Sequence, residues 1–303
     1  MAQSRAQMMK ELLPGLNALF GNEYATYDDE HTEIYSMESS DRSFEEEVQL
    51  SGFATAPVKS EGASIAYDTA QEVFTARYNH ETIALGFSIT EEAIEDNLYD
   101  SLSTRNTKSL ARAAANTKQV KAAYPFNNGF SGGAFSSGDG VTLFNTAHPL
   151  VSGGTNRNTP STQADLNETS LEQACIDIAA FTDQRGLKIA ARAKKIIVPS
   201  DLLFVVTRIL DTEMRPGTAD NDLNALRNNG SIPEGWRVNH YLNDVDSWFI
   251  ITDVPNGMKG FNRVAMSTSM DGDFDTGNVR YKCRERYSFG VSDPLGVYGS
   301  EGA

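Results

Sequence analysis

The sequence predicts an α+β fold in which a compact lobe carries long extensions. Residues 48–89 alternate as a β-hairpin does, and residues 90–124 follow the periodicity of one long helix. Residues 165–258 give the element order αβαββ, which is typical of a sheet flanked by helices. A chain of 303 residues is long enough to bury a sizeable core.

Residues 1–47 are predicted to form an arm rather than a domain. Two short apolar helical pieces are expected, the first ending at Pro14 and Gly15 and the second at Gly21. Residues 23–47 then contain ten acidic residues, including Glu45, Glu46 and Glu47, and only one basic residue. The segment has too little apolar periodicity for a core of its own, so another surface must supply its hydrophobic partner.

Residues 48–89 are predicted to form a hairpin with its tip within residues 54–64. Apolar residues of the return strand change parity partway, which predicts a bulge near Asn79–Glu81. Residues 72–89 would span roughly 55–60 Å as one strand, and a lone hairpin is marginal in water. We therefore expect the hairpin, with Phe74 and Tyr78 on one face, to lie on another surface, most simply a neighbouring copy.

Residues 90–124 are predicted to form a helix of about 50 Å that ends at Pro125. Ser88 and Glu91 have the spacing of a capping box at its start. Residues 101–125 contain five basic residues and no acid, and residues 184–195 contain five more. Acidic and basic blocks in one chain can pair within the chain or between copies. The candidate contacts on this helix are Arg105, Lys108 and Arg112.

The second half of the chain is more regular. Helices are expected over residues 169–184 and from Pro199 to Leu210, and a strand over residues 193–199. Further strands are expected over the sequence ranges 236–242, 248–254, 261–270 and 278–292.

Composition excludes several classes of protein. The chain has 26 basic and 41 acidic residues, a net charge of −15, whereas a protein that wraps nucleic acid needs a positive surface. The longest apolar run is far shorter than the ~20 residues of a membrane span, and we expect neither a membrane association nor a signal peptide. Cys175 and Cys283 are far apart and are expected to be reduced.

No catalytic, cofactor or metal site is expected. Ser131 lies in a G-x-S-x-G pattern, but the strand and helix that a nucleophile elbow needs are missing from the sequence around it. The alternating Asp271, Asp273 and Asp275 lack the Gly and Glu of a calcium loop and predict a hairpin turn. The four histidines have no paired spacing.

The order of these parts resembles the major capsid proteins of tailed bacteriophages with the Hong Kong 97 fold, and is most similar to the Mu-like major head subunits. Three segments look like those of that family: LFNTAHPL (143–150), NDLNALR (221–227) and ERYSFGVSDPLGVYG (285–299). Their order and spacing, rather than any single segment, carry the resemblance. The resemblance implies the following parts: an N-terminal arm (1–47), an E-loop hairpin (48–89), a P-domain with a spine helix (90–164), an A-domain (165–258) and P-domain return strands (259–303).

The resemblance also implies partners. Copies of the chain would form hexamers and pentamers of an icosahedral shell that encloses double-stranded DNA without sequence-specific binding, in a virion assembled in the host bacterial cytoplasm. A portal protein and, optionally, a decoration protein would join it. Few residues precede the arm, so a separate scaffolding protein is expected. Some members crosslink an E-loop lysine to a neighbour; for Lys59 we expect a non-covalent contact.

Two alternatives stay open on the sequence alone. The same fold could form an encapsulin-type bacterial compartment that stores protein. An enzyme, most plausibly a serine hydrolase using Ser131, is the other alternative.

Overall fold

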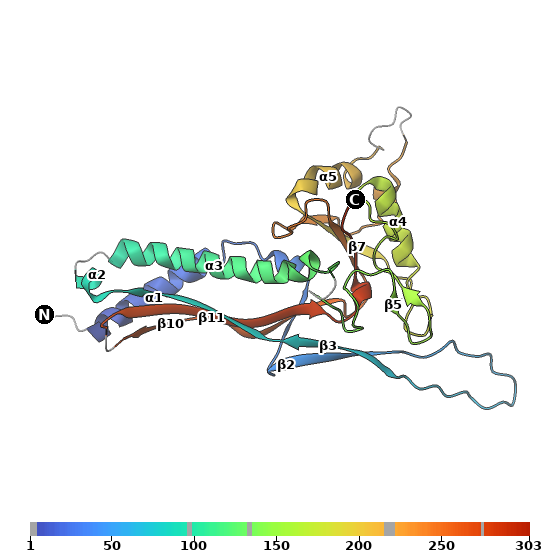
Figure 1. Ribbon diagram of the computed structural model, residues 1–303, viewed down its shortest axis with the longest axis horizontal. Helices are drawn as coiled ribbons and strands as arrows, with labels where there is room; N and C mark the ends of the chain where they lie inside the picture. The colour runs from blue at the N-terminus through green and yellow to red at the C-terminus, as the bar shows by residue number, and fades with distance from the viewer. Residues whose placement is uncertain (1–4, 96–98, 132–134, 215–221, 274–275) are drawn as a thin grey trace.

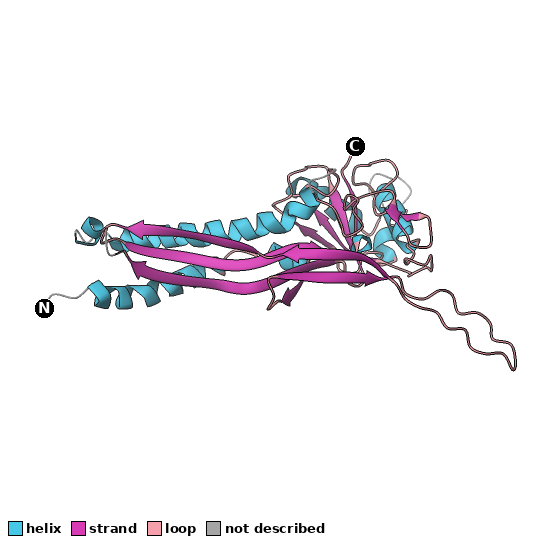
Figure 2. Ribbon diagram, turned by 60° about the horizontal axis from the view of Figure 1, so that its bottom comes forward, coloured by secondary structure: helices cyan, strands magenta, loops and turns pink. Residues whose placement is uncertain are grey.

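A computed structural model describes residues 5–95, 99–131, 135–214, 222–273 and 276–303. The molecule has an elongated part, here called the body, a compact part at one end, called the lobe, and a hairpin whose loop projects past the lobe (Figures 1 and 2). No helix among the described residues is long and apolar enough to cross a membrane.

The body is a four-stranded sheet with two long helices on one of its faces (Figure 2). The sheet has the order β1-β10-β11-β4, with β1 parallel to β10 and the other neighbours antiparallel. Its elements are α1 (Arg5–Tyr24), α3 (Tyr99–Asn127), β1 (Ser36–Ser39), β4 (Glu81–Ile89), β10 (Met258–Gly272) and β11 (Val279–Val291). Leu16 and Phe20 of α1 pack with Leu110 of α3 and with Tyr281 of β11 in one buried cluster.

Both helices differ from the prediction. Helix α1 runs through Pro14, Gly15 and Gly21 as one element, because the burial of its apolar face on α3 and β11 outweighs the weak local helix propensity. Helix α3 includes Pro125 in its last turn and ends at Asn127, and Phe126 is buried against aromatic side chains of the lobe. The short helix α2 (Glu91–Glu95) precedes it. Residues 96–98, which the predicted helix included, lie outside the described residues.

The hairpin differs from the prediction as well. Strand β2 (Phe44–Leu50) pairs with β3 (Glu72–Asn79), but the chain then changes sheets at His80, so that β4 pairs with β11. The parity change near Asn79–Glu81 marks this change of sheet rather than a bulge within one hairpin. His80 is buried and hydrogen-bonded to Ser40 and Ser288, each at 3.0 Å.

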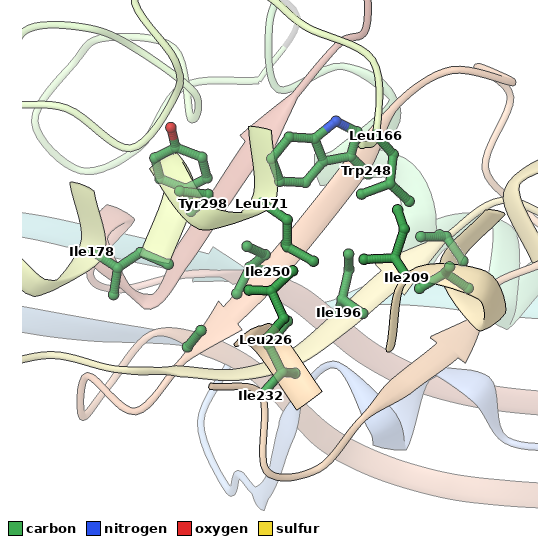
Figure 3. Packing of buried hydrophobic residues seen from close by; sticks show 14 of the residues in the cluster. Leu166, Leu171, Ile178, Ile196, Ile209, Leu226, Ile232, Trp248, Ile250 and Tyr298 are labelled. Atoms are coloured by element: carbon green, nitrogen blue, oxygen red, sulfur yellow. The ribbon is translucent and has the colours of Figure 1, made fainter. Parts of the chain in front are cut away.

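The lobe is a second four-stranded sheet of order β12-β9-β7-β8 covered by short helices. Trp248, Tyr298, Ile196 and Leu171 fill its core and are fully buried (Figure 3). Its main elements are β7 (Ala193–Val198), β8 (Trp236–Val238), β9 (Trp248–Thr252), β12 (Val297–Ser300), α4 (Glu168–Ala179), α5 (Leu203–Leu210) and α6 (Ala225–Asn228).

The C-terminal strand differs from the expectation. Residues 259–303 were expected to return to the body sheet, yet β12 pairs with β9 of the lobe. Glycines permit this return, because a Cβ on Gly296 would lie only 2.2 Å from the Cα of Gly257. The remaining short elements are the 3₁₀ turns η1 (Glu30–Glu33), η2 (Ser200–Leu202) and η3 (Pro294–Gly296) and the two-residue strands β5 (His148–Pro149) and β6 (Thr155–Asn156).

A second buried cluster joins the lobe to the body. Phe126 of α3, Phe249 of β9 and Phe144 form an aromatic group with ring centroids 4.7 to 6.3 Å apart. Tyr35, near β1, and Val291 of β11 belong to the same cluster, so the arm, the body and the lobe share one core.

Candidate assembly surfaces

The acidic segment is in large part neutralised by its own chain. Glu33 contacts Lys195 of the lobe at 2.5 Å, and Glu47 contacts Lys259 of β10 at 2.5 Å. Burial disfavours the charged ammonium of Lys259, but hydrogen bonds and charge from Glu47 and Glu38 raise its pKa above the ordinary value. Much of the acid–base pairing expected from the sequence is therefore made inside one chain.

The other two candidate glutamates of β2 also have partners within the chain. Glu46 lies 3.6 Å from Arg77 on β3, and the Arg77 guanidinium stacks 4.0 Å above the ring of Phe44. Glu45 accepts a hydrogen bond from Ser40. These contacts stiffen the base of the hairpin.

The two apolar candidates of the hairpin differ in exposure. Tyr78 is buried against Phe261, with ring centroids 4.9 Å apart, and its hydroxyl is 2.5 Å from that of Ser292. Its ring therefore faces the body sheet rather than solvent. Phe74, four residues earlier, is half-buried.

The loop between β2 and β3, residues 51–71, extends away from the rest of the molecule (Figure 1). It exposes large apolar side chains: Phe53, Val58, Ile65 and Tyr67 are 60%, 99%, 65% and 93% exposed. Lys59 is exposed near its far end. Soluble proteins rarely leave such a group of apolar side chains in water without a partner.

An ion pair between Asp68 and Arg185 connects the base of this loop to the lobe. Asp68 accepts a hydrogen bond from the backbone N–H of Ala54 at 2.8 Å and contacts Arg185 at 2.9 Å. The backbone N–H groups of Ala54 and Thr69, together with Arg185, lower the pKa of Asp68.

A groove of about 400 Å³ separates the base of the hairpin from the lobe. Asp293 lines it, accepting hydrogen bonds from the side chain of Gln49 at 3.1 Å and from the backbone of Leu295 at 2.9 Å. Burial raises the pKa of Asp293 to about 6. This residue could not be predicted from the sequence, because nothing in the pattern S-D-P indicates burial.

The outer face of α3 carries the basic candidates. Arg105, Lys108 and Arg112 are all exposed. Lys108 lies 3.8 Å from Glu23 at the end of α1. Among the described residues, Arg105 and Arg112 have no ion-pair partner, and the exposed side chains of Leu102 and Val120 lie on the same helix.

The structure does not assemble a catalytic constellation from the described residues. Ser131 is exposed and has no hydrogen-bond partner there. His148 is buried with Asp139 at 2.6 Å and Asn158 at 3.0 Å, and Asn158 also donates to two backbone carbonyls. This network fixes the connection after α3 and occupies both ring nitrogens of His148, so neither is available to a nucleophile. No group of three or more potential ligands for a metal ion occurs within the described ranges.

Comparisons with known proteins identify the fold. The capsid of an empty GTA particle is 15% identical with a TM-score of 0.55, covering 88% of this chain and 87% of the other. A virus-like particle from Pyrococcus furiosus is 8% identical with a TM-score of 0.54, covering 95% and 98%. The capsid protein of Myoviridae phage XM1 is 11% identical with a TM-score of 0.52, covering 89% of each chain.

These likenesses confirm the α+β capsid fold that the resemblance implied. No curated protein sequence matches the chain. A family model described as phage capsid protein matches residues 72–300, from strand β3 to the end of β12. Three quarters of the chain thus fall within the match, and the chain belongs to the phage capsid protein family.

Proposed function

We propose that this chain is the major head protein of a tailed bacteriophage, and that many copies assemble into an icosahedral shell around double-stranded DNA. The observation that carries the proposal, beside the family, is the loop 51–71, whose large apolar side chains the described part of the chain leaves exposed. Burial of apolar surface contributes roughly 25 cal/mol per Å², so a neighbouring copy that covers this loop would stabilise the shell.

The parts of the fold take the following roles in the proposal. Residues 1–47 are the N-terminal arm, 48–89 the E-loop, except that β4 joins the body sheet, 90–164 the P-domain with α3 as its spine, and 165–258 the A-domain. The strands of residues 259–303 complete the P-domain, except that β12 joins the A-domain sheet. The Mu-like subfamily is the proposed branch. Lys59 would contact the neighbouring copy without a covalent crosslink.

The net charge supports enclosure of DNA rather than binding of it. A shell lined by subunits of net charge −15 repels phosphate, which lets the duplex pack without adhering to the wall. A separate scaffolding protein, a portal and an optional decoration protein are the proposed partners, the virion is the proposed location, and the host cytoplasm is the proposed site of assembly. A catalytic role is not part of the proposal.

Electron microscopy of the purified full chain, with and without a scaffolding protein, tests the proposal. We expect closed shells, tubes or capsomers, and we expect nuclease-protected DNA in particles recovered from infected cells. Shells that enclose protein instead of DNA would support the encapsulin-type compartment. A chain that stays monomeric under every condition would refute both forms of the proposal.

A second experiment addresses the remaining alternative. A Ser131→Ala variant should assemble as the unmodified chain does, and neither protein should hydrolyse activated esters. Ester hydrolysis that disappears in the variant would indicate an enzyme.

A further inference from the structure

The body sheet has one face covered by helices and another that is only half covered. Near the lobe, the hairpin lies on this second face: Tyr78 packs on Phe261 and lies close to Gly290, and His80 is hydrogen-bonded to Ser288. Farther along β10 and β11, alternate residues are exposed on the same face. We call this uncovered part the open sheet face; it comprises the alternate, outward-facing residues within 82–88, 265–271 and 280–286 (Figure 2).

The central strand of the open sheet face carries a row of positive charges. Arg280, Lys282, Arg284 and Arg286 alternate along β11 with buried residues, so all four lie on one side of the strand, about 7 Å apart. We call these four residues the basic row. The sequence did not reveal this row, because its four residues alternate with uncharged or acidic residues and form no block of like charge.

The residues beside the basic row are small. Arg284 stands between Ser267 of β10 and Ala84 of β4, and Lys282 stands between Ser269 and Gly86. A Cβ at Gly86 would lie 2.7 Å from the backbone of β11. The basic side chains are therefore flanked by small side chains, so another polypeptide can approach the strand closely.

Little within the chain neutralises the basic row. Arg280 contacts Asp273 at 2.5 Å. Lys282 and Arg284 are exposed and form no ion pair within the described ranges, and the Nε atom of Arg286 is buried without a hydrogen-bond partner there. Positive charges this close repel one another, so carboxylates that approach from outside would stabilise Lys282 and Arg284.

We propose that the open sheet face docks exposed carboxylates of a second copy of this chain through Lys282 and Arg284. The inference rests on the proposed function, since it assigns one contact of the shell. A second copy brings a net charge of −15. Its exposed carboxylates that have no ion pair among the described residues include Glu61, Glu72, Glu92, Asp201, Asp246 and Glu301.

The observations favour a second copy over nucleic acid as the partner. A duplex that approached the basic row would meet the long-range repulsion of a strongly acidic molecule. The open sheet face also continues the surface that the hairpin of the same chain already covers near the lobe. A segment of a second copy on the open sheet face would extend the layer that the hairpin forms near the lobe.

The test compares two double variants of the full chain. Lys282→Ser with Arg284→Ser removes two charges from the basic row. Lys188→Ser with Arg192→Ser removes two exposed charges from the lobe, which also lack an ion pair in the described structure. Assembly is followed by light scattering and electron microscopy as NaCl increases, and folding by thermal melting. Both variants should melt close to the unmodified chain, since surface substitutions change stability little.

We expect the basic-row variant to need about a 5-fold or higher protein concentration for half-maximal assembly, from the small free energy of each exposed ion pair. Its assembly should also depend less on salt than that of the unmodified chain or the lobe variant. Lys282→Arg, which keeps the charge, should assemble normally. Equal thresholds and equal salt dependence in both double variants would overturn the inference while leaving the shell itself unaffected.

Two further readouts separate the remaining outcomes. If the basic-row variant assembles normally but loses affinity for a 30-base-pair duplex in fluorescence anisotropy at low salt, the partner is nucleic acid and the inference is wrong. If the unmodified chain forms no shells, sedimentation velocity decides. Small oligomers that disappear in the basic-row variant would support the inference while the proposed function fails, and a monomer at all concentrations would refute both.

Discussion

Single side chains at the base of the hairpin determine how it is attached to the rest of the molecule. The carboxylate of Glu47 contacts Lys259 of β10 and accepts a hydrogen bond from Ser292, each at 2.5 Å. Ser292 in turn is hydrogen-bonded to Tyr78. Charged hydrogen bonds in a partly buried place are stronger than exposed ones, so this junction is a rigid point from which the exposed loop extends.

Asp293 makes the stability of the hairpin base depend on pH. Its pKa in the folded chain is about 6, against an ordinary value of 3.8, so the folded state binds the proton more tightly than the unfolded state. The stability that protonation contributes is complete below pH 3.8 and is lost as pH rises through 6. Asp293→Asn should therefore gain about 1–2 kcal/mol of stability relative to the unmodified chain between pH 5 and pH 8.

Urea denaturation of both proteins at pH 5, 6, 7 and 8 measures this difference. Other titrating groups affect both proteins alike, so they cancel in the comparison. A constant difference across this range would mean that Asp293 is ionised and well solvated in the folded chain.

At the scale of elements, the sequence predicted which segments are helix and strand better than it predicted where they end. Pro14 and Gly15 are reliable helix breakers in isolation, but the burial of Leu16 and Phe20 in the body outweighs them. The parity change at Asn79–Glu81 was a correct observation with a wrong cause. Local alternation indicates which face a residue takes, whereas the partner strand is set by tertiary packing.

A buried ion pair links α3 to β11, and the loss of one partner should reduce the stability of the folded chain. Lys118 lies 3.6 Å from Glu285, with side chains only 13% and 3% exposed, and burial raises the pKa of Glu285 although Lys118 opposes the shift. Lys118→Met would leave that carboxylate buried without its partner, at a cost of about 3–5 kcal/mol near neutral pH. The cost should shrink at pH 5, where Glu285 can take up a proton instead.

Lys121→Met is the matched control, three residues further along the same helix. Its pair with Glu81 has a shorter distance, 2.7 Å, but both side chains are about half exposed, so the loss should stay under about 1 kcal/mol. Thermal and urea denaturation compare the two variants. Equal losses would show that exposure does not govern the strength of these pairs.

At the scale of the whole molecule, the net charge of −15 conceals a distribution that the sequence predicted only in part. The acidic arm and the basic blocks do pair, but Glu33 with Lys195 and Glu23 with Lys108 pair inside one chain. The sequence could not decide this, because pairing within and between copies demands the same composition. The sequence predicted a projecting hairpin from its alternating residues, with a tip within residues 54–64. The structure has a longer loop, residues 51–71, and divides the predicted return strand between two sheets.

The exposed basic residues of α3 are expected to contribute to assembly rather than to folding. Arg105 and Arg112 are exposed without an ion pair among the described residues, whereas Lys108 already contacts Glu23. Reversing Arg105, Lys108 and Arg112 to Glu should therefore impair assembly more than folding. The loss of folding stability should come mainly from Lys108→Glu and stay near 1 kcal/mol, as for other exposed pairs.

The double variant Arg105→Glu with Arg112→Glu separates the two effects, because it leaves the pair with Glu23 intact. It should melt with the unmodified chain and yet give fewer shells by electron microscopy, since like charges now face an acidic neighbour. Lys188→Glu with Arg192→Glu makes the same change of net charge on the lobe and controls for general repulsion between copies. If the double variant on α3 assembles at least as well as this control, the helix face does not meet an acidic surface, and its exposed Leu102 and Val120 must be explained by another neighbour.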